Sequence, residues 1–146
     1  MSASAPETLT ADGRCLIVLD RVLDAAAPQE GCALLLGTAR SSAWRLLHVW
    51  PCCNAWPDPA ERRRRFAIDP REQLLAQKWA RRHQLSVLGT AHSHPDSPPV
   101  PSPTDRALTP LRPTLMLIRG PGGPSRAWWL PEADAVPLEL QLLHEG

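Results

Sequence analysis

The segment LSVLGTAHSHPDSPPVPSPTD, residues 85–105, joins an apolar strand pattern to a proline-rich turn and the start of a helix. Its first ten residues alternate apolar and small side chains, which predicts a strand over residues 85–94. The prolines that follow lack the backbone N–H that a sheet needs, so the strand must end by Pro95. Ser102 followed by Pro103 has the pattern of an N-cap and a first helical residue, which predicts a helix there.

Three side chains in this segment could bind one metal ion. His92 and His94 are one residue apart on the predicted strand, so they point to the same face. Their Cα atoms would lie about 6.5–7 Å apart, a span that two imidazoles with zinc bonds of about 2.0–2.1 Å can bridge. Asp105 falls in the first helical turn and points back toward the strand end. Two imidazoles and one carboxylate leave the fourth position of a tetrahedral zinc ion to water, as in catalytic sites.

Each half of this pattern also has an ordinary structural explanation. A His-x-His pair by itself is an unremarkable feature of a strand. The pair Ser102 and Asp105 by itself is a plain helix start, in which serine caps the helix and an acidic residue favours the first turn. The prediction of a zinc site therefore depends on the joint occurrence of both halves.

Strand and helix patterns alternate on both sides of the segment. Further strands are expected at residues 15–19, 32–36, 44–50, 114–119 and 126–130. The second and third of these are expected to form a hairpin. Helices are expected at residues 21–29 and at residues 70–83, the latter with Asp69 as N-cap. Residues 51–65, with three prolines and four consecutive arginines, should form a surface loop. This order predicts a three-layer α/β domain with a mixed central sheet flanked by helices.

Side-chain spacing also predicts which residues face the core. Leu74, Leu75 and Trp79 follow helical spacing in the second helix, which predicts that they share its buried side. Trp128 and Trp129 are strand neighbours on opposite faces, so one is expected in the core and the other can be exposed. The arginines at residues 62–65 fit a solvated loop or a surface for an acidic partner.

The composition is that of a globular protein with one domain, with 146 residues of which 43% are hydrophobic and 21% charged. We expect a loose N-terminal arm at residues 1–12, a folded domain at residues 13–131 and a C-terminal extension at residues 132–146. The formal net charge of +1 gives no reason to expect a nucleic-acid partner. No apolar run approaches the roughly 20 residues of a membrane helix, and the polar N-terminal residues do not resemble a signal peptide. These features predict a cytoplasmic protein with no membrane association.

The four cysteines do not form a metal-binding pattern. Cys15, Cys32, Cys52 and Cys53 include no CxxC spacing, and the adjacent pair cannot comfortably bind one tetrahedral ion. Reduced thiols are the expected state, with a redox role as the alternative.

The region around the predicted zinc site resembles the signature of a known family. The stretch from His92 to Asp105 matches the H-[ST]-H-x7-S-x-x-D pattern of the JAMM (MPN+, or JAB-domain) zinc metallopeptidases without gap or substitution. Residues 28–37, PQEGCALLLG, resemble the glutamate-bearing P-x-E-x-C-G/A-L-L-G stretch of that family. Asn54 and residues 66–70 further resemble its short stand-alone prokaryotic members. The likeness extends from residue 15 to residue 130.

This resemblance implies a cytidine-deaminase-like fold and one Zn²⁺ ion per chain, bound by His92, His94 and Asp105. It also implies that Glu30 is the general base and that Ser102 steadies the bound water and the tetrahedral oxyanion. Without the family, Glu30 would fit a solvated position at a helix end. Family members cleave peptide or isopeptide bonds after the C-terminal Gly-Gly of ubiquitin-like proteins, and short members are thought to process sulfur carrier proteins. A ubiquitin-like or sulfur carrier protein is therefore the expected substrate.

Other protein classes share parts of the pattern. Non-catalytic MPN scaffolds, which bind ubiquitin-like or other partners, are the alternative function, although they lose the metal ligands that this chain keeps. Cytidine deaminases are related in fold, but their His-x-Glu and Pro-Cys-x-x-Cys signatures are absent from this sequence. RadC-type proteins share the metal motif and carry Asn where this chain has Ser93. The sequence leaves open whether residues 51–65 gate the site.

Overall fold

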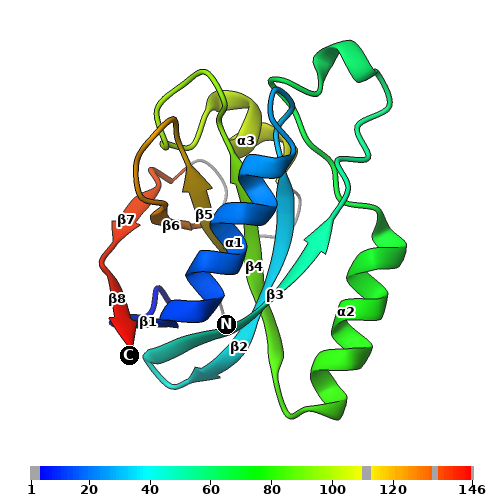
Figure 1. Cartoon of the computed structure of the whole chain (residues 1–146). Helices are drawn as coiled ribbons and strands as arrows, with labels where there is room; N and C mark the ends of the chain where they lie inside the picture. Colours follow the sequence, from blue (N-terminus) through cyan, green and yellow to red (C-terminus); the bar gives the residue numbers. More distant parts are fainter. Residues whose placement is uncertain (1–3, 110–112, 133–134, 146) are drawn as a thin grey trace.

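The computed structural model describes residues 4–109, 113–132 and 135–145. The strands in these ranges are β1 (Thr8–Asp12), β2 (Cys32–Arg40), β3 (Ala43–Cys52), β4 (Ser86–Ser93), β5 (Thr114–Arg119), β6 (Arg126–Leu130), β7 (Leu138–Leu140) and β8 (Leu142–Glu145). The helices are α1 (Gly13–Ala25), α2 (Pro70–Arg82) and α3 (Pro103–Leu108), together with a single 3-10 turn, η1 (Pro59–Glu61). The strands form one sheet in the order β7-β6-β5-β4-β2-β3-β1-β8 (Figure 1).

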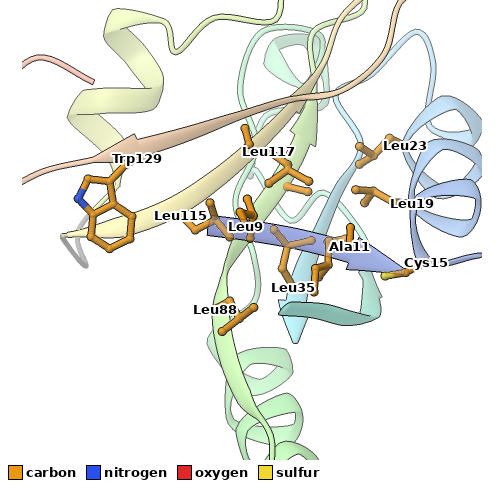
Figure 2. Packing of buried hydrophobic residues seen from close by; sticks show 14 residues of the cluster. Leu9, Ala11, Cys15, Leu19, Leu23, Leu35, Leu88, Leu115, Leu117 and Trp129 are labelled. Carbon is orange, nitrogen blue, oxygen red and sulfur yellow. The ribbon is translucent and has the colours of Figure 1, made fainter. Parts of the chain in front are cut away.

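The sheet is mixed and has a helix on each face. Strand β1 pairs in parallel with β3 and β8, and β4 pairs in parallel with β5, while the other pairs are antiparallel. Along β2, Ala33 and Leu35 belong to the core cluster under α1, whereas Leu34 and Leu36 belong to the cluster under α2. Figure 2 shows Leu19 of α1 pointing toward the sheet residues of the first cluster. The predicted three-layer α/β architecture is confirmed.

The expected strand at residues 15–19 is wrong, because these residues lie in α1. The side chain of Asp12 caps this helix by accepting a hydrogen bond from the backbone N–H of Arg14 at 2.8 Å. Cys15, Leu19 and Leu23 are buried at a spacing of four, the period of one helix face. The apolar run thus contributes Cys15 and Leu19 to the buried face of the helix, while Ile17 and Val18 are exposed. The helix ends at Ala25, whereas the sequence pattern predicted that it would continue to residue 29.

The expected arm at residues 1–12 and extension at residues 132–146 are wrong for the described parts of both segments. Leu9 and Ala11 of β1 are buried, and β1 lies between β3 and β8 in the sheet. Strand β7 pairs with β6 and extends the opposite edge. Both terminal segments thus belong to the domain, because each finds hydrogen-bond partners that are distant in the sequence.

The elements from residue 32 to residue 130 follow the sequence patterns closely. Strands β2 and β3 form the expected hairpin, and β4, β5 and β6 lie where they were predicted. Helix α2 starts after its N-cap Asp69, and α3 starts after its N-cap Ser102. The predicted loop at residues 51–65 is irregular apart from η1 and the last two residues of β3. Figure 1 shows α3 and this loop at the same end of the sheet.

The buried side of α2 differs from the prediction. Leu74 and Leu75 are 61% and 52% exposed, whereas Ala76 and Ala80 are buried. Small side chains allow the helix axis to lie close to the sheet, and a leucine in their place would push it away. Trp79 packs beside this contact, with its ring centroid 6.2 Å from that of Trp50.

Trp128 and Trp129 face opposite sides of β6, as predicted, but both are buried. Trp129 joins the core under α1, where its ring meets Trp44 edge-on at 5.6 Å between centroids. Trp128 is covered by the proline-rich segment between β4 and α3, and its Nε1 donates a hydrogen bond to the carbonyl oxygen of Pro99 at 2.9 Å.

All four cysteines are free thiols. Cys15 and Cys32 are buried, Cys52 is half-buried and Cys53 is exposed. Burial raises the pKa of Cys15 to about 11 and, helped by neighbouring groups, that of Cys32 to about 12, so both stay protonated near neutral pH. No helix in the described part of the chain has the length and apolar character needed to cross a bilayer. Cytoplasmic location and the lack of a nucleic-acid partner stay predictions.

Candidate metal centre

The two histidines and Asp105 converge where β4 ends and α3 begins. The Nε2 atoms of His92 and His94 are 3.1 Å apart. The Oδ2 atom of Asp105 lies 3.1 Å from His92 Nε2 and 3.0 Å from His94 Nε2. All three side chains are buried, so three potential ligand atoms form a nearly equilateral triangle inside the protein.

The triangle fits one zinc ion. Atoms bonded to zinc at about 2.0–2.1 Å in tetrahedral geometry are separated by about 3.3–3.4 Å, so the observed separations need only a slight expansion. The Nδ1 of His94 lies 2.7 Å from the carbonyl oxygen of Pro98, which can only accept a hydrogen bond. Nδ1 therefore donates to Pro98, and Nε2, which faces His92 and Asp105, is the nitrogen available to a metal ion.

Local sequence explains how each ligand is held. Ser102 and Asp105 form a capping box, in which Ser102 Oγ accepts from the backbone N–H of Asp105 at 3.0 Å. In return, Asp105 Oδ2 accepts from the backbone N–H of Ser102 at 2.9 Å. The ring of Phe66 stacks on His92 with 4.5 Å between centroids and 22° between planes. The capping box thus aims the carboxylate, and Phe66 confines the imidazole.

Electrostatics support a negatively charged site. Burial alone would raise the pKa of Asp105, but hydrogen bonds from His92 and His94 hold it well below its usual range. Burial lowers the pKa of His92 and favours its neutral form. For His94, interactions with Asp105 outweigh burial and raise the pKa. An ionised carboxylate between two imidazoles is the charge distribution that a divalent metal neutralises.

Glu30 lies just before β2, beside the ligands, and is only 4% exposed. Its Oε1 atom has no hydrogen-bond partner among the described residues. Burial raises the pKa of Glu30 to about 8, with a further rise from Asp105 and an opposing effect of His94. A cation at the three ligands would stabilise the Glu30 carboxylate and lower this pKa. A buried carboxylate with a raised pKa and a free oxygen can take up and release a proton near neutral pH.

Two hydrogen bonds join the Glu30 segment to the metal-binding strand. The backbone N–H of Gly31 donates to Ser93 Oγ at 2.8 Å, and the backbone N–H of Ser93 donates to the carbonyl oxygen of Gly31 at 3.1 Å. Ser93 lies between the two histidines in sequence and turns its side chain to the other face of β4. It therefore fixes the Glu30 segment through its side chain and backbone.

Asn54 holds the loop that covers Glu30. Its Nδ2 donates to the carbonyl oxygens of Glu30 at 3.0 Å and Arg65 at 2.8 Å. Its Oδ1 accepts from the backbone N–H groups of Trp56 at 3.0 Å and Ala67 at 3.3 Å. In the sequence, Asn54 stands out only through the family resemblance, because a single asparagine in a loop carries no local signal of such contacts.

A cavity of about 380 Å³ opens beside Asp105. Its walls include Trp56, Phe66, Ile68 and Thr104. Most of these side chains are apolar, and the loop at residues 51–65 contributes Trp56 and Arg65 to the wall. The cavity thus reaches the candidate site at Asp105.

The charge of the arginine run is partly compensated. Arg63 pairs with Asp96 at 3.3 Å, and Arg65 pairs with Glu61 at 3.5 Å. The Arg65 guanidinium also lies over the ring of Trp56, 5.4 Å from its centroid. These contacts favour a solvated, internally paired loop over a strongly basic docking surface.

Comparison with known proteins gives a consistent set of relatives. Residues 17–131 match the family model described as prokaryotic homologs of the JAB domain. The chain is 34% identical over 107 residues to a desampylase of Pyrococcus furiosus, covering 73% of this chain and 71% of that protein. It is 35% identical over 112 residues to a probable TtuB-protein conjugate cleaving protease of Thermus thermophilus, covering 77% of this chain and 69% of the relative.

A third relative is a desampylase of Haloferax volcanii, 33% identical over 119 residues, with 80% of this chain and 81% of the relative covered. Among solved structures, a protein from Desulfitobacterium hafniense superimposes with a TM-score of 0.83 at 27% identity, covering 94% of this chain and 93% of the other. A protein from Salinibacter ruber gives a TM-score of 0.67 at 26% identity, covering 93% and 91%.

Proposed function

The chain belongs to the prokaryotic JAB-domain family, and we propose that it is a zinc metallopeptidase that cleaves the bond after the C-terminal Gly-Gly of a ubiquitin-like or sulfur carrier protein. The observation that carries the proposal is the buried triangle of His92, His94 and Asp105 with the unpaired Glu30 carboxylate beside it. Relatives named desampylase and TtuB-protein conjugate cleaving protease support this class of substrate.

The chain's own residues would divide the work of amide hydrolysis. His92, His94 and Asp105 would hold a single zinc ion, which would supply Lewis-acid chemistry to activate water and polarise a carbonyl. Glu30 accepts the proton of the attacking water and then delivers it to the leaving nitrogen. Its burial keeps bulk water from competing for that proton.

Ser102 is suited to stabilise the oxyanion. Its Oγ already accepts a hydrogen bond from the backbone N–H of Asp105, so the hydroxyl proton remains available to a substrate oxygen. The same contact fixes Oγ at the start of α3, next to a metal ligand. Ser102 would thus be preorganised, and no movement would be needed when negative charge develops.

The cavity beside Asp105 is the space into which the substrate tail would enter. Glycine lacks a Cβ, so a Gly-Gly end allows the backbone to approach the buried ligands closely. The apolar wall at Phe66 and Trp56 would contact the residues that precede the two glycines. This arrangement suits an extended C-terminal tail better than a folded surface.

The proposal is tested with a sulfur carrier protein that is extended by several residues beyond its Gly-Gly end. Zinc-loaded protein should release the extension, detected by mass spectrometry, while the Glu30→Gln variant should be slower by about 10²–10⁴-fold, the usual contribution of general acid–base catalysis. Binding of the carrier without cleavage by either protein would instead favour the scaffold alternative.

A further inference from the structure

Residues 95–101, between β4 and α3, carry the backbone oxygen that orients His94. Four of these seven residues are prolines, so few backbone N–H groups are present to anchor the segment. The carbonyl oxygen of Pro98 nevertheless accepts from His94 Nδ1 at 2.7 Å and from the backbone N–H of Val100 at 2.8 Å. A residue outside the segment must therefore fix the position of the Pro98 carbonyl oxygen.

Trp128 of β6 provides this support from the sheet. Its Nε1 donates to the carbonyl oxygen of Pro99 at 2.9 Å, one residue after the oxygen that binds His94. The indole is 9% exposed, and the Arg126 guanidinium lies over the ring at 5.0 Å from its centroid. The tryptophan is therefore itself held in position and can act as a rigid donor.

Gly120, directly after β5, allows Pro99 to lie against the sheet. A Cβ at this position would come within 2.7 Å of Pro99 Cδ and 3.1 Å of Pro99 N, closer than packed atoms tolerate. The preceding residue, Arg119, accepts the backbone N–H of His94 at 2.8 Å through its carbonyl oxygen. The ends of β5 and β6 thus fix both the backbone of His94 and the segment that binds its ring.

We infer that Trp128 is a positioning residue for the metal centre, which fixes the ring orientation and the tautomer of His94 through the backbone of Pro99 and Pro98. The inference rests on the proposed zinc site, because it assigns a role in holding one of the ligands. Partners of metal-bound histidines typically contribute about 10–100-fold to metal affinity. Trp128 does not contact His94 directly but acts through the backbone of Pro99 and Pro98. We therefore expect its Nε1–H to contribute about 3–10-fold to zinc affinity.

The test compares Trp128→Phe with Trp129→Phe. Both variants lose an indole from neighbouring buried positions, but Trp129 packs on the opposite face of the sheet, against Trp44. Zinc affinity is measured by competition with a chromophoric chelator. Trp128→Phe should raise the dissociation constant for zinc about 3–10-fold, while Trp129→Phe should leave it within 2-fold even where its Tm falls. Equal zinc affinities in the two variants would overturn the inference.

A second pair of variants leaves Trp128 intact. Gly120→Ala should displace Pro99 and weaken zinc binding in the same direction as Trp128→Phe. Gly123→Ala is its control, because a Cβ at that position meets nothing closer than the carbonyl oxygen of Pro121 at 4.0 Å. This pair decides the question if Trp128→Phe does not fold, and no difference between the two glycine variants would then overturn the inference.

The hydrogen bond from His94 Nδ1 to the carbonyl oxygen of Pro98 gives a readout that does not depend on activity. In zinc-loaded protein, ¹⁵N NMR should show the Nδ1 proton of His94 protected from exchange with solvent in the wild type and in Trp129→Phe, and exchanging faster in Trp128→Phe. Equal exchange in Trp128→Phe and the wild type would contradict the positioning role. Failure of the wild type to bind zinc would instead overturn the proposed function, so the two failures are distinguishable.

Discussion

The three candidate metal ligands and Glu30 lie close together in the candidate site, yet the chain holds them by different means. His92 and Asp105 sit on regular structure, the first in β4 and the second in the first turn of α3. Glu30 sits in irregular backbone and is held by contacts with distant residues, above all Asn54 and, through Gly31, Ser93. The difference implies that metal binding and proton transfer are separable. Variants of the ligand side, which is His92, His94 and Asp105, should lose zinc, whereas variants of the Glu30 side should lose activity and keep zinc.

The largest effect is expected on the ligand side, from Asp105→Asn. The amide can still accept the N–H of Ser102, so the helix cap survives, but the anionic ligand is lost. Zinc affinity should fall by more than the roughly 10–100-fold that outer partners contribute, and peptidase activity should fall to background. Metal analysis of purified protein measures the first change. The control is Asp69→Asn, which makes the same side-chain change at the N-cap of α2 and should retain zinc. Equal zinc content in the wild type, Asp105→Asn and Asp69→Asn would refute the assigned ligands.

On the Glu30 side, the variant Glu30→Gln should abolish most of the peptidase activity while zinc stays bound. The amide keeps the shape of the side chain and loses the ability to take a proton, so kcat should drop by about 10²–10⁴-fold. Zinc affinity should change little, because Glu30 is not one of the three ligands. Parallel loss of zinc and activity in this variant would mean that the two sides are not separable after all.

A smaller effect of the same kind is expected from Asn54→Ala. Removing the side chain unpairs the carbonyl oxygen of Glu30 and loosens the covering loop, so kcat should fall about 10-fold with zinc affinity nearly unchanged. The control is Asp58→Ala, which removes a side-chain cap in the same loop that does not contact the Glu30 segment. A comparable loss of kcat in both variants would indicate general loop damage.

The last expected effect concerns stability instead of zinc binding or activity, and follows from the burial of Glu30. In metal-free protein its pKa of about 8 exceeds the value of 4.5 expected for the unfolded chain, so the unfolded state loses its proton first as the pH rises. The wild type should therefore lose stability relative to Glu30→Gln between pH 4.5 and 8, by roughly 3 kcal/mol at pH 7, and no further above that range. Urea denaturation at several pH values, with chelator present, measures the difference. Denaturation curves that keep a constant offset across this pH range would contradict the raised pKa.

The ligand side could be predicted from sequence because its rules are local. His92 and His94 share a strand face through the period of two, and Ser102 with Asp105 follows the rules of a helix start. No local sequence pattern of this kind predicts the position of Glu30. Its burial results from a loop and a strand that fold over it, so only the family resemblance indicated it in advance.

The errors in the fold have the same origin. The run from Cys15 to Leu19 contains central β-branched residues and was assigned to a strand, but burial of one helical stripe and the Asp12 cap favour a helix. Strand β1 is short and ordinary in composition, and what makes it a strand is the pairing offered by β3 and β8. Pairing between distant segments leaves no local pattern to detect.

The parallel pairing of β1 with β8 brings the first and last strands side by side, with Leu9 opposite Leu142 (Figure 1). During synthesis on a ribosome, β1 can find β3 early, but its second neighbour emerges only after the rest of the sheet has left the exit tunnel. Until then one edge of β1 stays open to other chains, which is the usual route to aggregation.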